Sequence, residues 1–397
     1  FPVLGNFIQQ ASTKHPEMVL PWLDISTGPL TRFLPGMLAG LMLSESHTNV
    51  REKIEGWINT GTRLSDIAWY LRFADPFQLE WLSNVLQKGI QAEDTHTICN
   101  CVDAAVRQFD KNPNHLIEQV LLPAIEAMAE LNDTGWLETA LVPWLRAPIL
   151  LALKQDQAIR VLDSLVPYPT LNNNSEYVTA AIAENWPDSV LEFLTQRMEY
   201  RSAAQKLERY EAIPSHPYQL PEHLAKSPTN FINAAKNWYQ IDGARYRFEG
   251  AELIARAFPE IPDELFVELK PLAKTDPCFV LDTLSAFDGH ETVYPLVQEV
   301  IANSSGDKKI MRAAHHTLHE SGVVSGEFGY VKLYKERKNL IEPWLDHENK
   351  AVQDFAEHHL ADLESSILNE TKRAEASIAA RKLSFGEEIE SDDESED

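Results

Sequence analysis

Apolar residues recur at helical spacing along almost the whole chain. In one stretch, Val178 and Ile182 are followed by Val190, Leu191 and Leu194. Steps of three and four residues place such side chains on one face of a helix. Few alternating β-branched runs are long enough to form a strand. The pattern therefore predicts an all-α protein.

Prolines mark the predicted starts of several helices. Proline is tolerated in the first helical turn because its missing N–H has no partner there, and an Asp, Asn or Ser just before it can cap the free donors. Six prolines each precede an apolar helical run: Pro16, Pro76, Pro113, Pro187, Pro228 and Pro277. Their spacing is a loose period of about 40 residues, which is the size of a two-helix repeat.

One stretch shows the two-helix plan near the start of the chain. In residues 41–58 a helix is expected to end near Leu43, and the next opens at Asn49 after a short polar turn. The second helix places Val50, Ile54 and Trp57 on one face. A helix pair of this kind cannot bury its apolar face alone, so neighbouring pairs are expected to stack.

A second stretch, residues 341–363, repeats the plan. It has Leu345, a turn over residues 346–350, and then Val352, Phe355 or Ala356, and Leu360 pointing inward. Both stretches resemble the HEAT repeat, with Asp346, Val352 and Ala356 in their usual places and Gln353 where that repeat often has Arg. The resemblance implies an α-solenoid of antiparallel helix pairs, a HEAT- or TPR-like superhelix. From the apolar spacing and the acidic run at the end of the sequence, we expect the array to end in one long helix and a disordered acidic tail.

Composition shifts divide the chain. Residues 212–228 hold four prolines and few helix-length runs, which is typical of an irregular connection. The predicted parts are N-terminal helical repeats (1–211), the proline-rich connection (212–228), C-terminal helical repeats (229–350), a last repeat helix (351–385) and an acidic disordered tail (386–397). We expect the last helix to pack on its repeat rather than form a coiled coil, because its apolar stripe is short and broken.

The charge balance narrows the function classes. The formal net charge is -25, which repels phosphate backbones and disfavours nucleic-acid binding. The tail, residues 386–397, contributes eight acidic side chains and no basic one.

The apolar runs are too short to cross a bilayer. Three cysteines, Cys99, Cys101 and Cys278, are too few for a disulfide framework and fit a reducing cytoplasm.

Three glycines in the stretch SGVVSGEFGY, residues 321–330, raise the question of a phosphate-binding loop. Their spacing matches no nucleotide fingerprint, and Glu327 puts negative charge where a phosphate would sit. We interpret the glycines as residues that end one helix and connect it to the next. Gly322 closes a helix that begins near Lys309, and a second helix runs from about Gly329 to Ile341.

Histidines offer the main candidate for metal chemistry. His315 and His319 stand four residues apart on one predicted helical face, a spacing that can hold a metal. The Glu that follows the first His in a metalloprotease helix is missing, and Glu320 is the nearest carboxylate. We expect surface histidines and no metal or other cofactor. A metal-dependent enzyme at His315 and His319 is the remote alternative, and no catalytic residues are assigned.

One helix is basic in an otherwise acidic body. Residues 330–341 carry cations that either pair with nearby carboxylates or meet a partner. The candidate partner-binding residues are Tyr330, Lys332, Lys335, Arg337 and Lys338. The spacing of Tyr330 and Tyr334 favours packing in the core.

The C-terminal half resembles a known kind of protein. Residues 321–388 are similar to the closing segment of large bacterial proteins that place a STAND-type ATPase before a long helical-repeat region, and residues 209–239 are similar to the part before it. The resemblance implies a sensor arm of the antiviral defence class that binds an invader's protein and releases the ATPase into oligomerisation. This sequence contains no ATP-binding motif, and it begins at Phe1, so we expect it to be part of a longer polypeptide.

These observations favour a protein-binding α-solenoid that is not itself an enzyme. The expected role is the ligand-sensing C-terminal region of a bacterial STAND-type defence ATPase, with a protein ligand such as a viral protein. Oligomerisation would then occur through an upstream domain. The alternative is a free-standing HEAT-like scaffold or adaptor. We expect a cytoplasmic protein without a membrane partner.

Overall fold

The computed structural model describes residues 2–24, 30–139, 141, 147–203, 209–215, 217–319 and 324–384. Within these ranges the chain forms helices joined by turns and contains no strand, which confirms the all-α prediction. Gly322 and the acidic segment 386–397 lie outside the described residues. The expectations for both therefore stay predictions.

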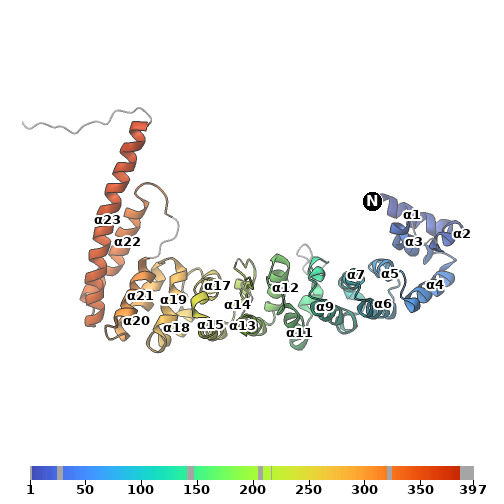
Figure 1. Cartoon of the computed structure of the whole chain (residues 1–397), viewed down its shortest axis with the longest axis horizontal. Helices are drawn as coiled ribbons and strands as arrows, with labels where there is room; N and C mark the ends of the chain where they lie inside the picture. Colours follow the sequence, from blue (N-terminus) through green and yellow to red (C-terminus); the bar gives the residue numbers. More distant parts are fainter. Residues whose placement is uncertain are drawn as a thin grey trace, which may run out of the picture. The chain divides into compact units, whose positions relative to one another are not determined.

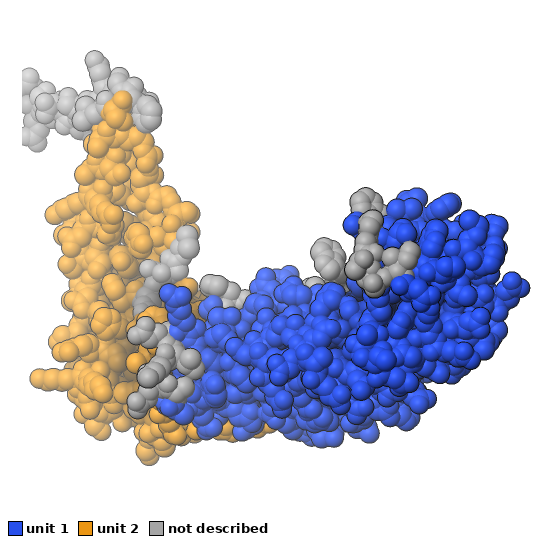
Figure 2. All heavy atoms as spheres, turned by 45° about the vertical axis from the view of Figure 1, so that its right-hand side comes forward, with its two compact units in different colours: residues 1–227 blue, residues 228–397 orange. Residues whose placement is uncertain are grey.

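The chain divides into unit 1, residues 1–227, and unit 2, residues 228–397 (Figure 2). The division falls at the end of the proline-rich segment 212–228. Part of that segment is the short helix α14 (Leu220–Leu224), which packs on α12 (Asn173–Ala183) and α13 (Pro187–Ala203). The segment is therefore built into the packing of unit 1.

The remaining α-helices of unit 1 are α1 (Pro2–Lys14), α2 (Pro16–Val19), α3 (Leu34–Leu41), α4 (His47–Thr60), α5 (Leu64–Leu71), α6 (Leu79–Gln91), α7 (Thr95–Arg107), α8 (Pro113–Leu116), α9 (Leu122–Glu130), α10 (Pro148–Leu151) and α11 (Gln155–Leu165). Shorter turns are the 3-10 helices η1 (Leu20–Asp24), η2 (Thr31–Phe33), η3 (Phe109–Lys111) and η5 (Gly135–Glu138), and the π-helical turn η4 (Ile117–Leu121).

The helices of unit 1 contact one another in two rows (Figure 1). In row A each of α3, α5, α7, η5, α12 and α14 packs against the next. In row B the same holds for α4, α6, α9, α11 and α13. Neighbours along the chain, such as α5 with α6 and α12 with α13, join the rows. Each helix thus buries its apolar face between a partner in the other row and the next helix of its own row.

Unit 2 comprises α15 (Pro228–Ile241), α16 (Gly243–Tyr246), α17 (Gly250–Ala257), α18 (Asp263–Thr275), α19 (Pro277–Leu284), α20 (Tyr294–Asn303), α21 (Lys308–His319), α22 (Gly329–Ile341) and α23 (Lys350–Ser384), with the 3-10 turns η6 (Ser285–Phe287), η7 (Glu291–Val293) and η8 (Glu342–Asp346). Here α17, α19 and α21 pack in succession, as do α15, α18, α20 and α23. The long helix α23 also packs along α22.

Buried side chains follow the predicted stripes, with one exception. In residues 41–58, Val50 and Ile54 are fully buried as expected, but Ile58 takes the third inward position while Trp57 is only half-buried. In residues 341–363, Val352, Ala356 and Leu360 are buried. The stripe shifts by one residue because 3.6 residues per turn allow either of two neighbours to face inward.

A glycine allows α1 and α3 to pack closely in unit 1. A Cβ at Gly40 in α3 would lie 2.2 Å from the carbonyl oxygen of Gln9 and 2.6 Å from Cβ of Ser12, both in α1. No larger residue fits there without moving backbone. The hydroxyl of Thr13 donates to the carbonyl of Gly40 across the same contact, at 3.2 Å. The packing of α1 on α3 therefore depends on this position.

Candidate protein-docking surface

Two large aromatic side chains of unit 1 lie exposed at the end of α5. Trp69 is 45% exposed and Phe73 is 63% exposed. Trp69 lies in the last turn of α5, and Phe73 follows the end of the helix by two residues. The opposite face of α5 buries Ile67, Ala68 and Leu71 in the core. We refer to Trp69 and Phe73 as the aromatic pair.

Two guanidinium groups lie over the rings of the aromatic pair. The guanidinium carbon of Arg72 is 4.0 Å from the centre of a Trp69 ring, and that of Arg107 is 5.4 Å from the centre of the Phe73 ring. Arg72 forms a buried ion pair with Asp103 of α7. Burial, followed by the charge of Arg107, lowers the pKa of Arg72 to about 10, so this guanidinium stays charged at neutral pH. These stacked cations reduce the freedom of both rings.

The backbone beneath the aromatic pair is also fixed. The buried side-chain amide of Gln108 donates from Nε2 to the carbonyl oxygens of Leu71, at 3.1 Å, and Ala74, at 3.2 Å. These two bonds satisfy carbonyls at the C-terminal end of α5 that have no partner within the helix. The aromatic pair therefore projects from a turn that is fastened to the end of α7.

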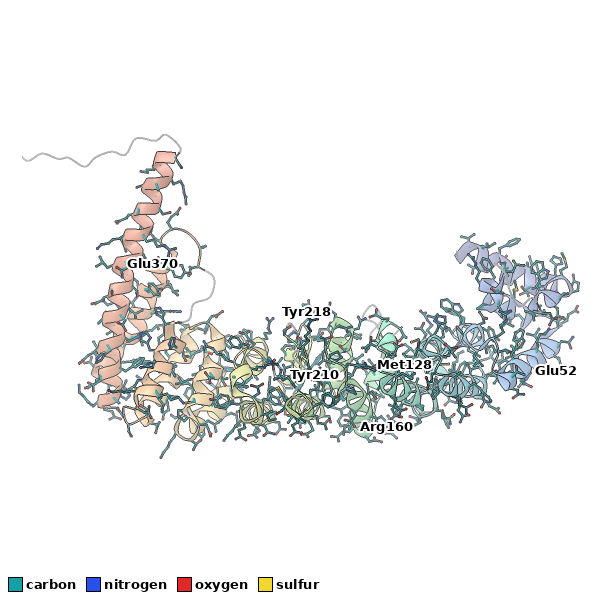
Figure 3. All side chains as sticks on the ribbon, viewed as in Figure 1. Glu52, Met128, Arg160, Tyr210, Tyr218 and Glu370 are labelled. Atoms are coloured by element: carbon teal, nitrogen blue, oxygen red, sulfur yellow. The ribbon has the colours of Figure 1, made fainter. Side chains whose placement is uncertain are left out.

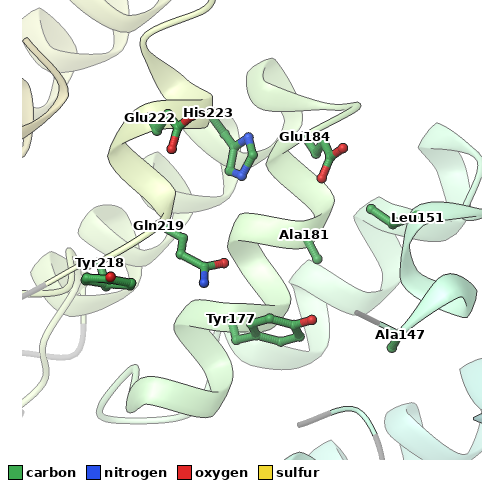
Figure 4. Close-up of a pocket in the computed structure, with 9 residues that line it drawn as sticks. All are labelled: Ala147, Leu151, Tyr177, Ala181, Glu184, Tyr218, Gln219, Glu222 and His223. Carbon is green, nitrogen blue, oxygen red and sulfur yellow. The ribbon is translucent and has the colours of Figure 1, made fainter. Parts of the chain in front are cut away.

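A groove opens in row A of the same unit, between α10, α12 and α14 (Figure 4). Its volume is about 380 Å³. Tyr177, Ala181 and Glu184 line it from α12, and Tyr218 stands at its edge with 88% of its surface exposed. Figure 4 shows the side chains of Glu184, Glu222 and His223 around the same opening. The groove thus combines aromatic surface with carboxylates.

One carboxylate joins two sides of the groove, α12 and the start of α14. Oε1 of Glu176, in α12, accepts hydrogen bonds from the backbone N–H groups of Tyr218 at 3.1 Å, Gln219 at 2.8 Å and Leu220 at 2.8 Å. The negative charge lies at the N-terminal end of α14, where the helix leaves donors without partners. Glu176 is only 8% exposed. It therefore places Tyr218 relative to α12.

The aromatic pair and the groove belong to one continuous series of helices. Row A leads from α5 through α7 and η5 to α12 and α14. Figure 3 shows Tyr218 at this edge of unit 1 and Arg160 at the opposite edge, on α11 of row B. We call the exposed side of α5, α7, η5, α12 and α14 the row A surface. Exposed Trp, Tyr and Arg are the residue types that dominate binding energy at protein interfaces.

Part of the positive charge of the predicted basic helix, α22, is paired with carboxylates of the same chain. Lys338 lies 2.7 Å from Glu364 of α23 and 3.7 Å from Glu342, and Lys332 lies 3.8 Å from Glu336. Lys335 is exposed. Tyr330 is 38% exposed and its ring centre lies 6.2 Å from that of Tyr334. The structure therefore places three of the predicted cations where solvent reaches them.

Arg337 differs from the expectation. We expected Arg337 among the cations that pair with nearby carboxylates or meet a partner, but only 2% of the residue is exposed. Its Nη1 donates to the carbonyl oxygen of His319 at the end of α21, at 3.0 Å. Burial lowers the pKa of Arg337. Its side chain joins α22 to α21, because a guanidinium can satisfy carbonyls that a helix end leaves free.

The histidine pair lies on α21 as predicted, with its rings stacked 5.7 Å apart. Nε2 of His315 is 3.1 Å from Oδ2 of Asp362. Among the described residues no group of three or more His, Cys, Asp or Glu side chains is arranged to hold a metal ion. Glu320 lies outside the described residues. Within the described ranges, the metal hypothesis therefore has no third ligand.

The cysteines are all free thiols. Cys101 is buried in α7, and burial raises the pKa of the neighbouring Cys99 thiol to about 11. A thiol with so high a pKa is a poor nucleophile at neutral pH.

Among the helices described, none is long and apolar enough to span a membrane.

Comparison of the chain with family models, with curated proteins and with solved structures finds no match. The assignment of the surface therefore rests on its geometry. Sequence reasoning missed Trp69, Phe73, Glu176 and Tyr218. A usable signal existed for Trp69, because it stands off the buried stripe of its helix.

Proposed function

We propose that the chain is a protein-binding α-solenoid and that a protein ligand docks on the row A surface of unit 1. The serial packing within both rows supports a stack of helix pairs. Such stacks present long surfaces suited to binding another macromolecule. The proposal extends the all-α fold to a repeat architecture.

The observation that carries the proposal is the aromatic pair. Two large rings exposed by 45% and 63% cost solubility unless a partner covers them. Arg72, Gln108 and Asp103 hold these rings and their backbone in place before binding. A surface that is already ordered loses less conformational entropy when it binds. The aromatic pair therefore has the properties of an interface anchor.

The ligand is proposed to be a protein. The row A surface combines aromatic rings, guanidinium groups and the carboxylates of Glu184 and Glu222. Mixed charge around aromatic anchors suits a polypeptide with both polar and apolar side chains. A phosphate backbone would be repelled by a chain with a net charge of -25.

The resemblance to STAND-type ATPases suggests what ligand binding would do: it would change the state of an upstream domain. In that setting, a ligand on the row A surface biases an upstream switch by preferring one of its states. The ligand would then be a protein of an invading virus. We keep this sensor role as the proposed role, with the free-standing scaffold as its alternative.

The test is affinity capture from phage-infected bacteria with three forms of the chain. These are the wild type, Trp69→Ala/Phe73→Ala, and Ile159→Ala as a control. Ile159 is 40% exposed on α11 in row B, so it matches Trp69 in exposure but not in surface. Removing both anchors should weaken capture by at least about tenfold, since each buried aromatic anchor contributes roughly 1 kcal/mol or more.

Mass spectrometry of the captured proteins gives the decision. A specific phage protein that is lost with Trp69→Ala/Phe73→Ala and kept with Ile159→Ala supports the sensor role. Host proteins with the same dependence support the scaffold. Equal recovery with all three forms would remove the row A surface from the account.

A further inference from the structure

A second groove lies in unit 2, between α21 and the first turns of α23. Its volume is about 870 Å³. Met311 of α21 and Ala351 and Phe355 of α23 form its apolar floor. This volume and lining are in the range of sites that bind organic ligands or peptide side chains. The row A surface of unit 1 does not include this groove.

The edges of the groove carry both charges, and among the residues that the structure describes the carboxylates have ion-pair partners. Oδ1 of Asp354 lies 2.7 Å from Nζ of Lys350, and Asp362 is engaged by His315. Lys308 and Arg312 are exposed on the α21 edge and form no ion pair with any described residue of unit 2. The groove therefore has two cations available for an acidic ligand.

A buried histidine lies at the groove with its hydrogen bonds unmade. His359 is 1% exposed, and neither of its ring nitrogens has a hydrogen-bond partner among the described residues. Its ring stacks on Phe355 with centres 5.5 Å apart and meets His315 edge-on at 4.8 Å. Burial, followed by the charges of His315 and His319, lowers the pKa of His359 to about 3, so the ring is neutral. A neutral imidazole offers one donor and one acceptor, which a peptide main chain can satisfy.

We propose that this groove binds the acidic segment 385–397 of a second copy of the chain. The segment carries eight acidic residues together with two apolar ones, Phe385 and Ile389. Its charge complements Lys308 and Arg312, and its apolar side chains match the floor of the groove. In a chain whose net charge is -25, an acidic ligand is otherwise repelled, so these two cations give the site its selectivity.

The length of α23 places the two apolar residues of the segment, Phe385 and Ile389, out of reach of the groove within one chain. In Figure 1, α23 is a straight helix, and it continues from Asp362 at the groove to Ser384. That distance is roughly 33 Å at about 1.5 Å per residue. Ile389 follows Ser384 by five residues, which extend over at most about 18 Å. Phe385 and Ile389 of the same chain therefore cannot reach the groove.

The first test uses a fluorescent synthetic peptide of residues 383–397 and the full chain, with binding followed by fluorescence anisotropy. We expect saturable binding that Lys308→Glu/Arg312→Glu weakens by about tenfold or more. Lys270→Glu/Lys274→Glu is the matched control, because these two lysines are exposed on α18, away from the lining of the groove. This variant changes the net charge equally and should leave binding unchanged. Equal weakening in both variants would overturn the proposal, as would the absence of saturable binding.

The second test examines the apolar contacts and the hydrogen bonds between the segment and the groove. A peptide with Phe385→Ser and Ile389→Ser should lose binding, and His359→Phe, which keeps an apolar ring, should weaken it. Sedimentation velocity of the full chain should show concentration-dependent association that Lys308→Glu/Arg312→Glu abolishes. If the serine peptide binds as well as the natural one, or if the full chain stays monomeric at every concentration, docking of a second copy is refuted.

Discussion

Arg197 of α13 provides the sharpest test of how unit 1 is held together. Its side chain is fully buried, and its guanidinium donates to five backbone carbonyls. Three of them, in residues 165–168, lie at and after the end of α11, and the other two belong to Glu211 and Ala212. One side chain thus joins three segments of the unit. We predict that Arg197→Met destabilises unit 1.

The magnitude follows from the carbonyls. Leu165 and Val166 keep other donors, the N–H of Tyr168 and the hydroxyl of Tyr210. For the carbonyls of Tyr168, Glu211 and Ala212, the described donor is the guanidinium. Three buried acceptors without partners cost about 1 to 3 kcal/mol each, or about 6 kcal/mol in total. Burial lowers the pKa of Arg197 to about 10, so removing this buried charge returns about 3 kcal/mol. The net loss is about 3 kcal/mol.

Thermal unfolding followed by circular dichroism measures this loss. For a unit of 227 residues, about 3 kcal/mol corresponds to a fall in Tm of about 6 to 12 °C. The control is Arg160→Met in the same unit. Arg160 pairs with Glu126 at 2.7 Å on the surface, where such a pair contributes less than about 1 kcal/mol. If both variants melt within about 2 °C of each other, the reasoning from carbonyl satisfaction is refuted.

Three further predictions concern other parts of the fold. Because the pKa of His359 falls from 6.5 to about 3, the unfolded chain binds its proton first. The free energy of unfolding should therefore drop by about 2 kcal/mol between pH 6.5 and pH 5. Urea denaturation should show a smaller drop in His359→Phe. The charged and titratable groups that face this ring stay in place in that variant; they are His315, His319, Asp362 and Arg337. Glu176→Ala should speed hydrogen exchange of the amides of residues 218–220 by at least about tenfold, since their common acceptor is lost; unchanged exchange would contradict the proposed placement of α14. Gly40→Ala should destabilise unit 1 by about 1 to 3 kcal/mol through overpacking, whereas Gly56→Ala in α4, which has nothing within 4 Å, should stabilise it by up to about 1 kcal/mol in the same denaturation assay.

The sequence predicted helix starts well where proline sits at the first turn. Pro16, Pro113, Pro187, Pro228 and Pro277 each begin a helix. Pro76 does not, since α6 begins at Leu79 after Gln78 adopts an extended conformation. The rule works because proline costs little where the helix has no N–H partner, but it cannot show how far beyond a proline the helix starts.

At two of these starts, the residue before the proline can cap the helix but does not. Asn112 and Asp276 make no side-chain cap. Oδ1 of Asn112 lies 2.8 Å from the ring of His115, and the carboxylate of Asp276 pairs with Lys236 at 2.8 Å. Local sequence identifies a residue that can cap, but the partner it takes depends on neighbours that tertiary packing brings near.

Buried arginines were the hardest feature to predict. Arg197 and Arg337 each bind carbonyls at the ends of other segments. Arginine is usually exposed, so a sequence pattern places it on the surface. Its burial follows only once the free carbonyls are known in space. The same limit applies to Trp69 and Phe73, whose exposure depends on how α5 packs on α7.

Site-specific photo-cross-linking in phage-infected cells tests the central claim most directly. A benzophenone amino acid is placed at Phe73 on the row A surface, or at Ile159 on row B as the control. Our account predicts a cross-linked protein partner from position 73 and none from position 159. Cross-linking from position 159 alone, or from neither position under conditions where the ligand is captured, would contradict the claim that ligands dock on the row A surface.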